Sequence, residues 1–122
     1  MVKNKNSINK LVNLIVEGIV DIKGKDVKVL DLRDIDSAVC DYFIICNGTS
    51  NTHVNAIVNS IQKTVNESIH DKPWHIEGTE NGEWVLLDYV NVVAHVFQKH
   101  IRDYYDIESL WGDAKLISIE QD

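Results

Sequence analysis

The sequence predicts an α/β fold, a single layer-packed domain in which helices flank a mixed five-stranded sheet. Three observations predict it: two long stretches repeat apolar residues at helical spacing, five shorter stretches are rich in β-branched and aromatic residues, and the two kinds alternate along the chain. The order helix, two strands, helix, three strands, helix is typical of helices packed on one sheet. With no linker and no internal repeat, residues 1–122 are expected to form one domain.

The first half of the chain supplies a helix and two strands. Apolar residues recur at helical spacing over 7–23, where Ser7 can cap the helix and Gly24 can end it in a left-handed conformation. Residues 27–32 are then expected to form a strand. The run 42–46 is β-prone and apolar on both faces, which indicates a central strand that is covered on both sides.

A turn at 47–51 leads into a second amphipathic helix of about 20 residues, which Pro73 prevents from continuing. Three strands follow. Residues 74–77 and 83–87 are expected to pair through a hairpin at Asn81-Gly82, and the third strand covers 92–97. A helix from about 99 to 105 and a turn at 108–111 are expected to close the chain.

Composition restricts the possible function. With 12 basic and 19 acidic residues the net charge is −7, so direct sequence-specific nucleic-acid binding is not expected, whereas an acidic surface suits a basic protein partner. The two cysteines, Cys40 and Cys46, do not form a disulfide framework. The longest apolar stretch, 11–20, is too short and too polar to span a membrane, and no transit or secretory signal is evident. A cytoplasmic protein is therefore expected.

The sequence offers no catalytic, cofactor or metal site. The five histidines lack metal-ligand spacing, and no nucleophile elbow or phosphate-binding loop occurs. One enzyme hypothesis was tested: the order strand, Gly48-Thr49-Ser50, helix is similar to the opening of the nucleotidyltransferase fold, where such a turn binds phosphate. Two carboxylates should then alternate on a later strand, but Asp88 is followed two positions on by Val90. The Gly-Thr-Ser turn is instead expected to cap the helix.

Aromatic residues gather between Trp84 and Trp111. The chain reads Trp-Val-Leu-Leu-Asp-Tyr at 84–89, Val-Val-Ala-His-Val-Phe at 92–97 and Arg-Asp-Tyr-Tyr-Asp-Ile-Glu-Ser-Leu-Trp at 102–111. This succession closely resembles the signature of the ribosome silencing factors, the Iojap-type family. Asp-Tyr-Phe-Ile-Ile at 41–45, Gly-Thr-Ser at 48–50 and Ile-Glu-Gly at 76–78 resemble further elements of that family, and the domain would cover about 8–115.

Two positions depart from the family pattern. Val90-Asn91 stands where the family usually has Gly-Asp, and one carboxylate is thereby lost. A glycine accommodates positive φ, which valine resists, so Asn91 is expected to take the left-handed position in a reshaped turn. Ile107 replaces a leucine, which is a conservative change.

The resemblance implies a nucleotidyltransferase-like topology without the active site, and a protein that is not an enzyme. It implies a partner, protein fourteen of the large ribosomal subunit, on the face that meets the small subunit. Bound there, the factor would block subunit joining and repress translation when nutrients are scarce. The resemblance also implies a homodimer when the protein is free. A purely structural homodimerisation domain is the alternative.

Strand alternation predicts which residues could bind that partner. Trp84, Leu86 and Asp88 should share one face of their strand, and Tyr89 should lie on the other. An aromatic anchor beside an acid suits a protein-docking surface, although Trp84 could equally pack in the core and Trp111 is expected to pack the closing helix onto the sheet. The residues predicted to bind the ribosomal partner are Trp84, Leu86, Asp88, Tyr89, Asn91, His95, Tyr105 and Trp111.

Overall fold

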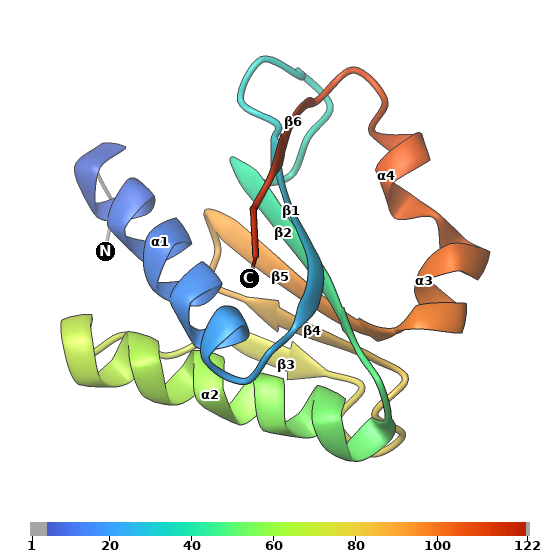
Figure 1. The fold of residues 1–122 in the computed structure, drawn as a ribbon. Coiled ribbons are helices and arrows are strands. Elements are labelled where there is room, and N and C mark those ends of the chain that lie inside the picture. The colour runs from blue at the N-terminus through green and yellow to red at the C-terminus, as the bar shows by residue number, and fades with distance from the viewer. Residues whose placement is uncertain (1–4, 122) are drawn as a thin grey trace.

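A six-stranded sheet forms the centre of the computed structural model, which describes residues 5–121 (Figure 1). Its strands lie in the order β3-β4-β5-β2-β1-β6. The strands β2 and β5 are parallel and every other neighbouring pair is antiparallel, so the predicted mixed sheet is confirmed. The bounds are β1 Lys25–Asp31, β2 Tyr42–Gly48, β3 His75–Glu77, β4 Trp84–Asp88, β5 Val92–Gln98 and β6 Lys115–Ser118.

The predicted number of five strands is wrong, because β6 adds a sixth at the edge of the sheet, where it pairs antiparallel with β1. Its four residues are all exposed and include only two apolar side chains, Leu116 and Ile117. A segment of four residues is too short to show the alternation of apolar and polar residues that indicates a strand. It becomes a strand because the free edge of β1 offers backbone N–H and C=O groups that need partners.

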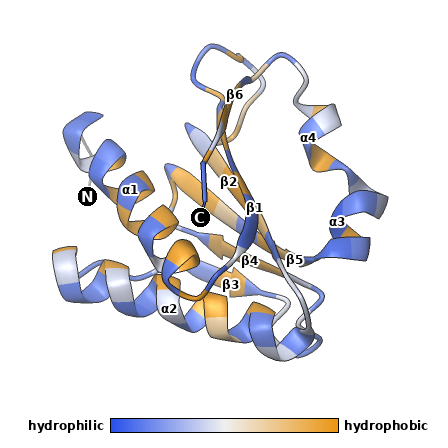
Figure 2. Cartoon of the chain, in the orientation of Figure 1, coloured by the Kyte–Doolittle hydropathy of each residue, from blue (hydrophilic) through white to orange (hydrophobic). Residues whose placement is uncertain are grey.

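Four helices flank the sheet. The long helices α1 (Lys5–Asp21) and α2 (Asn51–Ile69) cover one face, and the short helices α3 (Lys99–Tyr105) and α4 (Ile107–Leu110) lie on the other (Figure 1). Figure 2 shows that α1 and α2 turn their apolar sides toward the sheet. The predicted helix at 99–105 is confirmed. The predicted turn at 108–111 is wrong, since most of it belongs to α4.

Both predicted caps of the first helix are wrong. The helix already includes Lys5, so Ser7 lies inside its first described turn. At the other end Lys23, with φ 58°, takes the left-handed conformation that was expected of Gly24. Gly24 is needed for a different reason: a Cβ atom there would collide with the side chain of Ile19. The glycine therefore permits close packing of the chain as it leaves α1.

The start of α2 agrees with the sequence. The Ser50 hydroxyl accepts a hydrogen bond from the His53 N–H at 3.0 Å, so the Gly-Thr-Ser turn caps the helix as predicted. The hairpin after Pro73 also forms, with β3 and β4 antiparallel. Its loop is longer than a two-residue turn and spans 78–83, with Gly78 and Gly82 both at positive φ.

The turn between β4 and β5 contradicts the prediction for Asn91. Val90, not Asn91, is left-handed, with φ 76°. The neighbouring contacts explain the choice. The Val90 N–H donates to the Asp88 carboxylate at 2.7 Å, and the Asn91 carbonyl accepts from the N–H groups of Asp41 and Tyr42. These bonds hold Asn91 in register with the start of β2, so Val90 takes the strained left-handed conformation.

The core has two parts, one on each face of the sheet. The larger lies under α1 and α2 and includes Ile15, Ile57 and Val96. The smaller lies on the opposite face around Phe43, Ile45 and Phe97. All seven residues of β2 are buried, which confirms the prediction of a central strand covered on both sides.

Candidate partner-docking surface

An incompletely covered aromatic surface lies on the sheet face opposite α1 and α2. Its side chains come from β4, β5 and the two short helices. In β4 the burial alternates, with Val85 and Leu87 buried and Trp84, Leu86 and Asp88 half-buried, so the predicted division of the strand into two faces is confirmed. We call the following residues the aromatic surface: Trp84, Leu86, His95, Tyr105 and Trp111.

Ring contacts hold the aromatic surface together. The Trp84 ring stacks on Phe97 at 4.8 Å between centroids and meets Tyr105 at 4.9 Å. Trp111 meets the edge of Phe43 at 5.8 Å. Trp84 and Trp111 are both only half-buried, so each packs against the smaller core while part of its ring faces solvent. Trp84 therefore packs partly in the core, and its exposed part leaves the docking interpretation as a prediction.

His95 is the polar centre of the aromatic surface. Its side chain is 4% exposed, and its Nδ1 accepts a hydrogen bond from the Trp84 indole N–H at 3.1 Å. Phe43 packs edge-on against the imidazole, with the centroids 4.7 Å apart. Burial lowers the pKa of His95 to about 4, so the imidazole is neutral at physiological pH. Its Nε2 has no hydrogen-bond partner among the residues that the structure describes.

Tyr89 does not belong to this surface. Its side chain is 1% exposed and lies in the larger core, on the face that α1 and α2 cover. Burial raises the pKa of its phenol well above the ordinary value. The prediction that Tyr89 binds a partner is therefore wrong, for the reason that strand alternation itself gave: Tyr89 continues the inward-facing series of Val85 and Leu87.

Acidic and amide groups border the aromatic surface at the end of β4. The Asp88 carboxylate accepts from the Val90 N–H at 2.7 Å, and the Asn91 amide donates to the Asp41 carboxylate at 3.4 Å. Each of these four residues is at least partly accessible, and Val90 is exposed. We call Asp41 and Asp88 the acidic rim. The Asn91–Asp41 contact and the Asp88–Val90 contact place both carboxylates at the turn between β4 and β5.

A buried arginine ties the two short helices to the sheet. The Arg102 guanidinium donates to the Asn47 side-chain oxygen at 2.8 Å, to the Asp26 carbonyl at 2.7 Å and to the Glu108 carboxylate at 2.8 Å. Arg102 is 7% exposed. Because Glu108 belongs to α4, this one side chain fixes α3, α4 and the strands β1 and β2 together.

Sequence reasoning missed the role of Arg102, since no pattern in a seven-residue helix distinguishes a buried arginine from a solvated one. Two exposed apolar side chains, Tyr104 and Leu110, were left out of the residues predicted to bind the partner, and they are 80% and 76% exposed. The adjacent pair Leu110-Trp111 carried a usable signal. Leu110 ends α4 and Trp111 follows it, and two successive side chains at a helix end point in different directions, so both are not expected to face the core.

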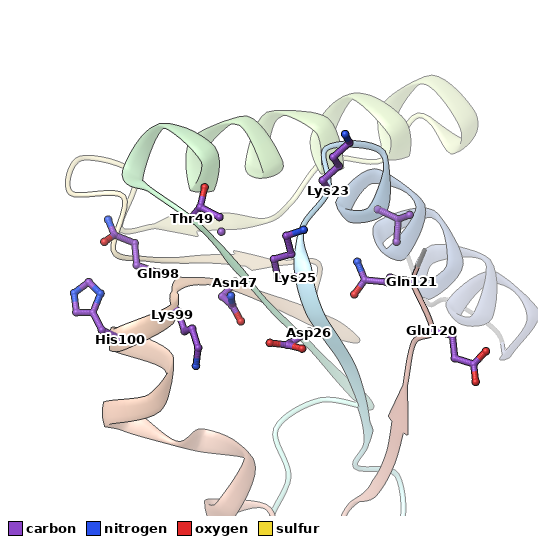
Figure 3. Close-up of a pocket in the computed structure, with 12 residues that line it drawn as sticks. Lys23, Lys25, Asp26, Asn47, Thr49, Gln98, Lys99, His100, Glu120 and Gln121 are labelled. Atoms are coloured by element: carbon purple, nitrogen blue, oxygen red, sulfur yellow. The ribbon is translucent and has the colours of Figure 1, made fainter.

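A separate cavity lies at the carboxyl ends of β2 and β5, where the nucleotidyltransferase hypothesis would place a ligand (Figure 3). It has a volume of about 1060 Å³, and Asn47, Thr49, Lys25 and Lys99 are among its lining residues. Two groups of the turn are already engaged within the chain: the Thr49 N–H donates to His53 Nδ1 at 2.9 Å, and the Ser50 hydroxyl oxygen accepts from the His53 N–H at 3.0 Å.

The carboxylates do not support nucleotidyl transfer either. Strand β5 pairs its last residue, Gln98, with Gly48, whereas Asp88 pairs with Val93 near the opposite end of β5. Asp88 is therefore separated from the Gly-Thr-Ser turn by the length of the strand. Across residues 5–121 no group of three His, Cys, Asp or Glu side chains is placed to hold a metal ion. No helix in the described part of the chain is long and apolar enough to cross a membrane.

A small α/β domain with a partly open aromatic sheet face and an acidic rim is typical of a protein-binding domain. Comparison with known proteins makes this specific. The model of the family RsfS, "Ribosomal silencing factor during starvation", matches residues 5–122, and the chain belongs to this family.

Relatives and a solved structure agree with this assignment. The "Ribosomal silencing factor RsfS" of Halalkalibacterium halodurans is 40% identical over 115 residues, which cover 93% of this chain and 96% of the relative. The protein of the same name from Chromobacterium violaceum is 44% identical over 108 residues, with 88% and 87% covered. A crystal structure of a Chromobacterium violaceum protein matches with a TM-score of 0.80 at 44% identity, over 86% of each chain.

Proposed function

We propose that this chain silences ribosomes by docking its aromatic surface on the large ribosomal subunit, where it blocks joining of the small subunit. The contact would be made with protein fourteen of the large subunit, in the cytoplasm, and would repress translation when nutrients are scarce. Membership of the ribosomal silencing factor family supports the general role. The proposal depends on one structural observation: the half-buried Trp84 and Leu86 lie on the sheet face that the long helices leave open.

Charge supports a basic ribosomal partner. The chain carries a net charge of −7, and Asp88 of the acidic rim lies at the end of the same strand that carries Trp84 and Leu86. Opposite charge across an interface raises the association rate and disfavours wrong partners. An aromatic anchor in a partly desolvated centre with charge at the border is the arrangement found in protein interfaces with a few dominant residues.

A pair of matched leucine variants tests the surface. Leu86→Arg places a positive charge at the centre of the aromatic surface, whereas Leu116→Arg places it on the exposed edge strand β6. We expect Leu86→Arg to abolish co-sedimentation with purified large subunits and Leu116→Arg to bind like the parent chain. Both should keep the parent's circular dichroism spectrum. Equal binding by a folded Leu86→Arg variant would show that another face docks.

The acidic rim is tested by Asp88→Asn, because the asparagine oxygen can still accept the Val90 N–H while the charge is lost. Glu67→Gln, on the exposed side of α2, is the control for a change of one charge. We expect Asp88→Asn to weaken large-subunit binding by about 5-fold to 10-fold at low salt, with the difference shrinking as salt increases. Equal weakening by both variants would indicate a response to net charge alone.

Self-association is part of the proposal: the free chain is expected to form a homodimer. Sizing over a dilution series, with and without large subunits, tests this and also the alternative of a purely structural dimerisation domain. Release of monomers onto the subunit would favour docking. A dimer that never binds large subunits would favour the structural role.

A further inference from the structure

The protonation of His95 can be assigned from its contacts. The Trp84 indole nitrogen can only donate, so the Nδ1 atom that it meets at 3.1 Å must carry a lone pair. The imidazole is neutral, because burial disfavours its charged form. Its single proton therefore resides on Nε2. His95 points an N–H donor into an enclosed place where the described residues supply no acceptor.

A buried donor without an acceptor destabilises a fold, and buried polar groups are nearly always paired. An apolar ring would avoid this cost at position 95. The imidazole is surrounded by rings, with Phe43 at 4.7 Å, Trp84 at 6.0 Å and Phe97 at 6.2 Å between centroids. A phenylalanine would suit these neighbours. Positions where a sequence keeps a locally unfavourable group are expected at functional sites.

The position of His95 in the sheet brings this donor close to the candidate docking surface. In the pairing of β4 with β5, His95 lies directly opposite Leu86, and Trp84 contacts its ring. Leu86 and Trp84 are themselves half-exposed. The imidazole thus lies beside Leu86 and Trp84, two side chains that a docking partner would touch first.

We propose that His95 determines specificity in docking by donating its Nε2–H to a carbonyl oxygen of the partner protein once Leu86 has moved aside, while the Trp84 indole keeps its bond to Nδ1. This inference rests on the proposed function, since it uses the same surface. The hydrogen bond would satisfy in the complex a donor that is unsatisfied in the free protein. A surface built to pair such a donor discriminates against partners that lack the acceptor, because the donor then stays buried and unpaired.

Two substitutions at His95 separate this role from packing. In His95→Gln the side-chain oxygen can accept from the Trp84 indole and the amide nitrogen can donate, so both functions of the imidazole are kept. In His95→Phe the ring remains and both functions are lost. We expect His95→Phe to unfold close to the parent's temperature, because removal of the unpaired Nε2–H offsets loss of the Trp84 hydrogen bond, yet to bind isolated protein fourteen at least 10-fold more weakly. His95→Gln should bind within about 3-fold of the parent.

The outcomes distinguish this inference from the function on which it rests. If Leu86→Arg abolishes binding while His95→Phe binds like the parent, the aromatic surface docks and the role given to His95 is wrong. If Leu86→Arg also binds like the parent, the docking surface itself is wrong. Binding losses that follow the losses of thermal stability in both His95 variants would show a packing role only.

A measurement on the parent chain needs no variant to fold. Nitrogen-15 labelling of histidine reports the tautomer and the Nε2–H proton of His95 directly by NMR. In the free protein we expect the neutral form with the proton on Nε2. Titration with isolated protein fourteen should move that proton resonance downfield as the new hydrogen bond forms. An unchanged resonance in the saturated complex would overturn the proposal.

Discussion

Replacing Arg102 with methionine should show how much one buried side chain contributes to the shape of the docking surface. The guanidinium makes three hydrogen bonds of 2.7 to 2.8 Å, to Asn47, Asp26 and Glu108, and is 7% exposed. Methionine fills similar space but leaves the Asn47 oxygen without its donor and the Glu108 carboxylate without its partner. Tyr105 on α3 and Trp111 after α4 would lose the main polar attachment of their helices to the sheet.

The magnitude follows from the burial of the partners. Removing one member of a buried ion pair typically costs about 3–5 kcal/mol. The Glu108 side chain is 28% exposed, so solvent recovers part of its loss and the lower end applies, at about 3 kcal/mol. For a domain of this size that corresponds to a fall in melting temperature of about 10 °C.

Urea unfolding monitored by tryptophan fluorescence measures this free energy directly. The slope of the unfolding free energy against urea should stay unchanged, because the same surface is exposed. Glu108→Gln is the control: its amide oxygen still accepts from Arg102, so the cost should stay within about 1 kcal/mol. The reasoning would be refuted if Arg102→Met unfolded within about 0.5 kcal/mol of the parent, the range of ordinary surface substitutions.

Three further predictions concern strain, reactivity and pH. Val90→Gly should raise the unfolding free energy by about 1 kcal/mol in urea titrations, because glycine tolerates the φ of 76°; Asn91→Gly should not, and a gain in both variants would point to another cause. Burial raises the pKa of Cys40 and Cys46 to about 12. Neither thiol should therefore react with a disulfide reagent at pH 8 before urea is added, and rapid labelling of the folded chain would contradict this. The pKa of His95 is about 4 in the folded chain and 6.5 in the unfolded chain, so only the unfolded chain gains this proton as the pH falls from 6.5 to 4. The free energy of unfolding should therefore drop by about 3 kcal/mol across that window. His95→Gln should lack this component, and identical pH profiles of the two proteins would refute the assignment.

Most of the fold could be predicted because most of its helices and strands show recognisable patterns in their local sequence. The period of the apolar residues in α1 and α2 and the continuous apolar run of β2 depend only on neighbours along the chain. Strand alternation in β4 was sufficient to separate Trp84 and Leu86 from Val85 and Leu87, as the burial confirms. Alternation also placed Tyr89 on the face opposite Trp84; its inclusion among the partner-binding residues was wrong because α1 and α2 cover that face.

Three of the failures share a cause, since each depends on partners far away in sequence. β6 is a strand only because β1 has a free edge, and Val90 is strained because Asn91 bonds to the backbone at Asp41 and Tyr42. The burial of Arg102 depends on Asn47, fifty-five positions away. No local propensity records such contacts.

The sequence by itself determined the kind of protein. It is an α/β domain whose aromatic segments identify its family, and it lacks the pair of alternating carboxylates that a nucleotidyltransferase active site requires. The tertiary structure decided which of those aromatic groups remain available to a partner. The long helices cover only one face of the sheet, so Tyr89 is buried while Trp84 and Leu86 stay half-open on the other. It also placed His95 beneath them with an unpaired donor, because burial depends on how layers pack and not on the identity of one residue.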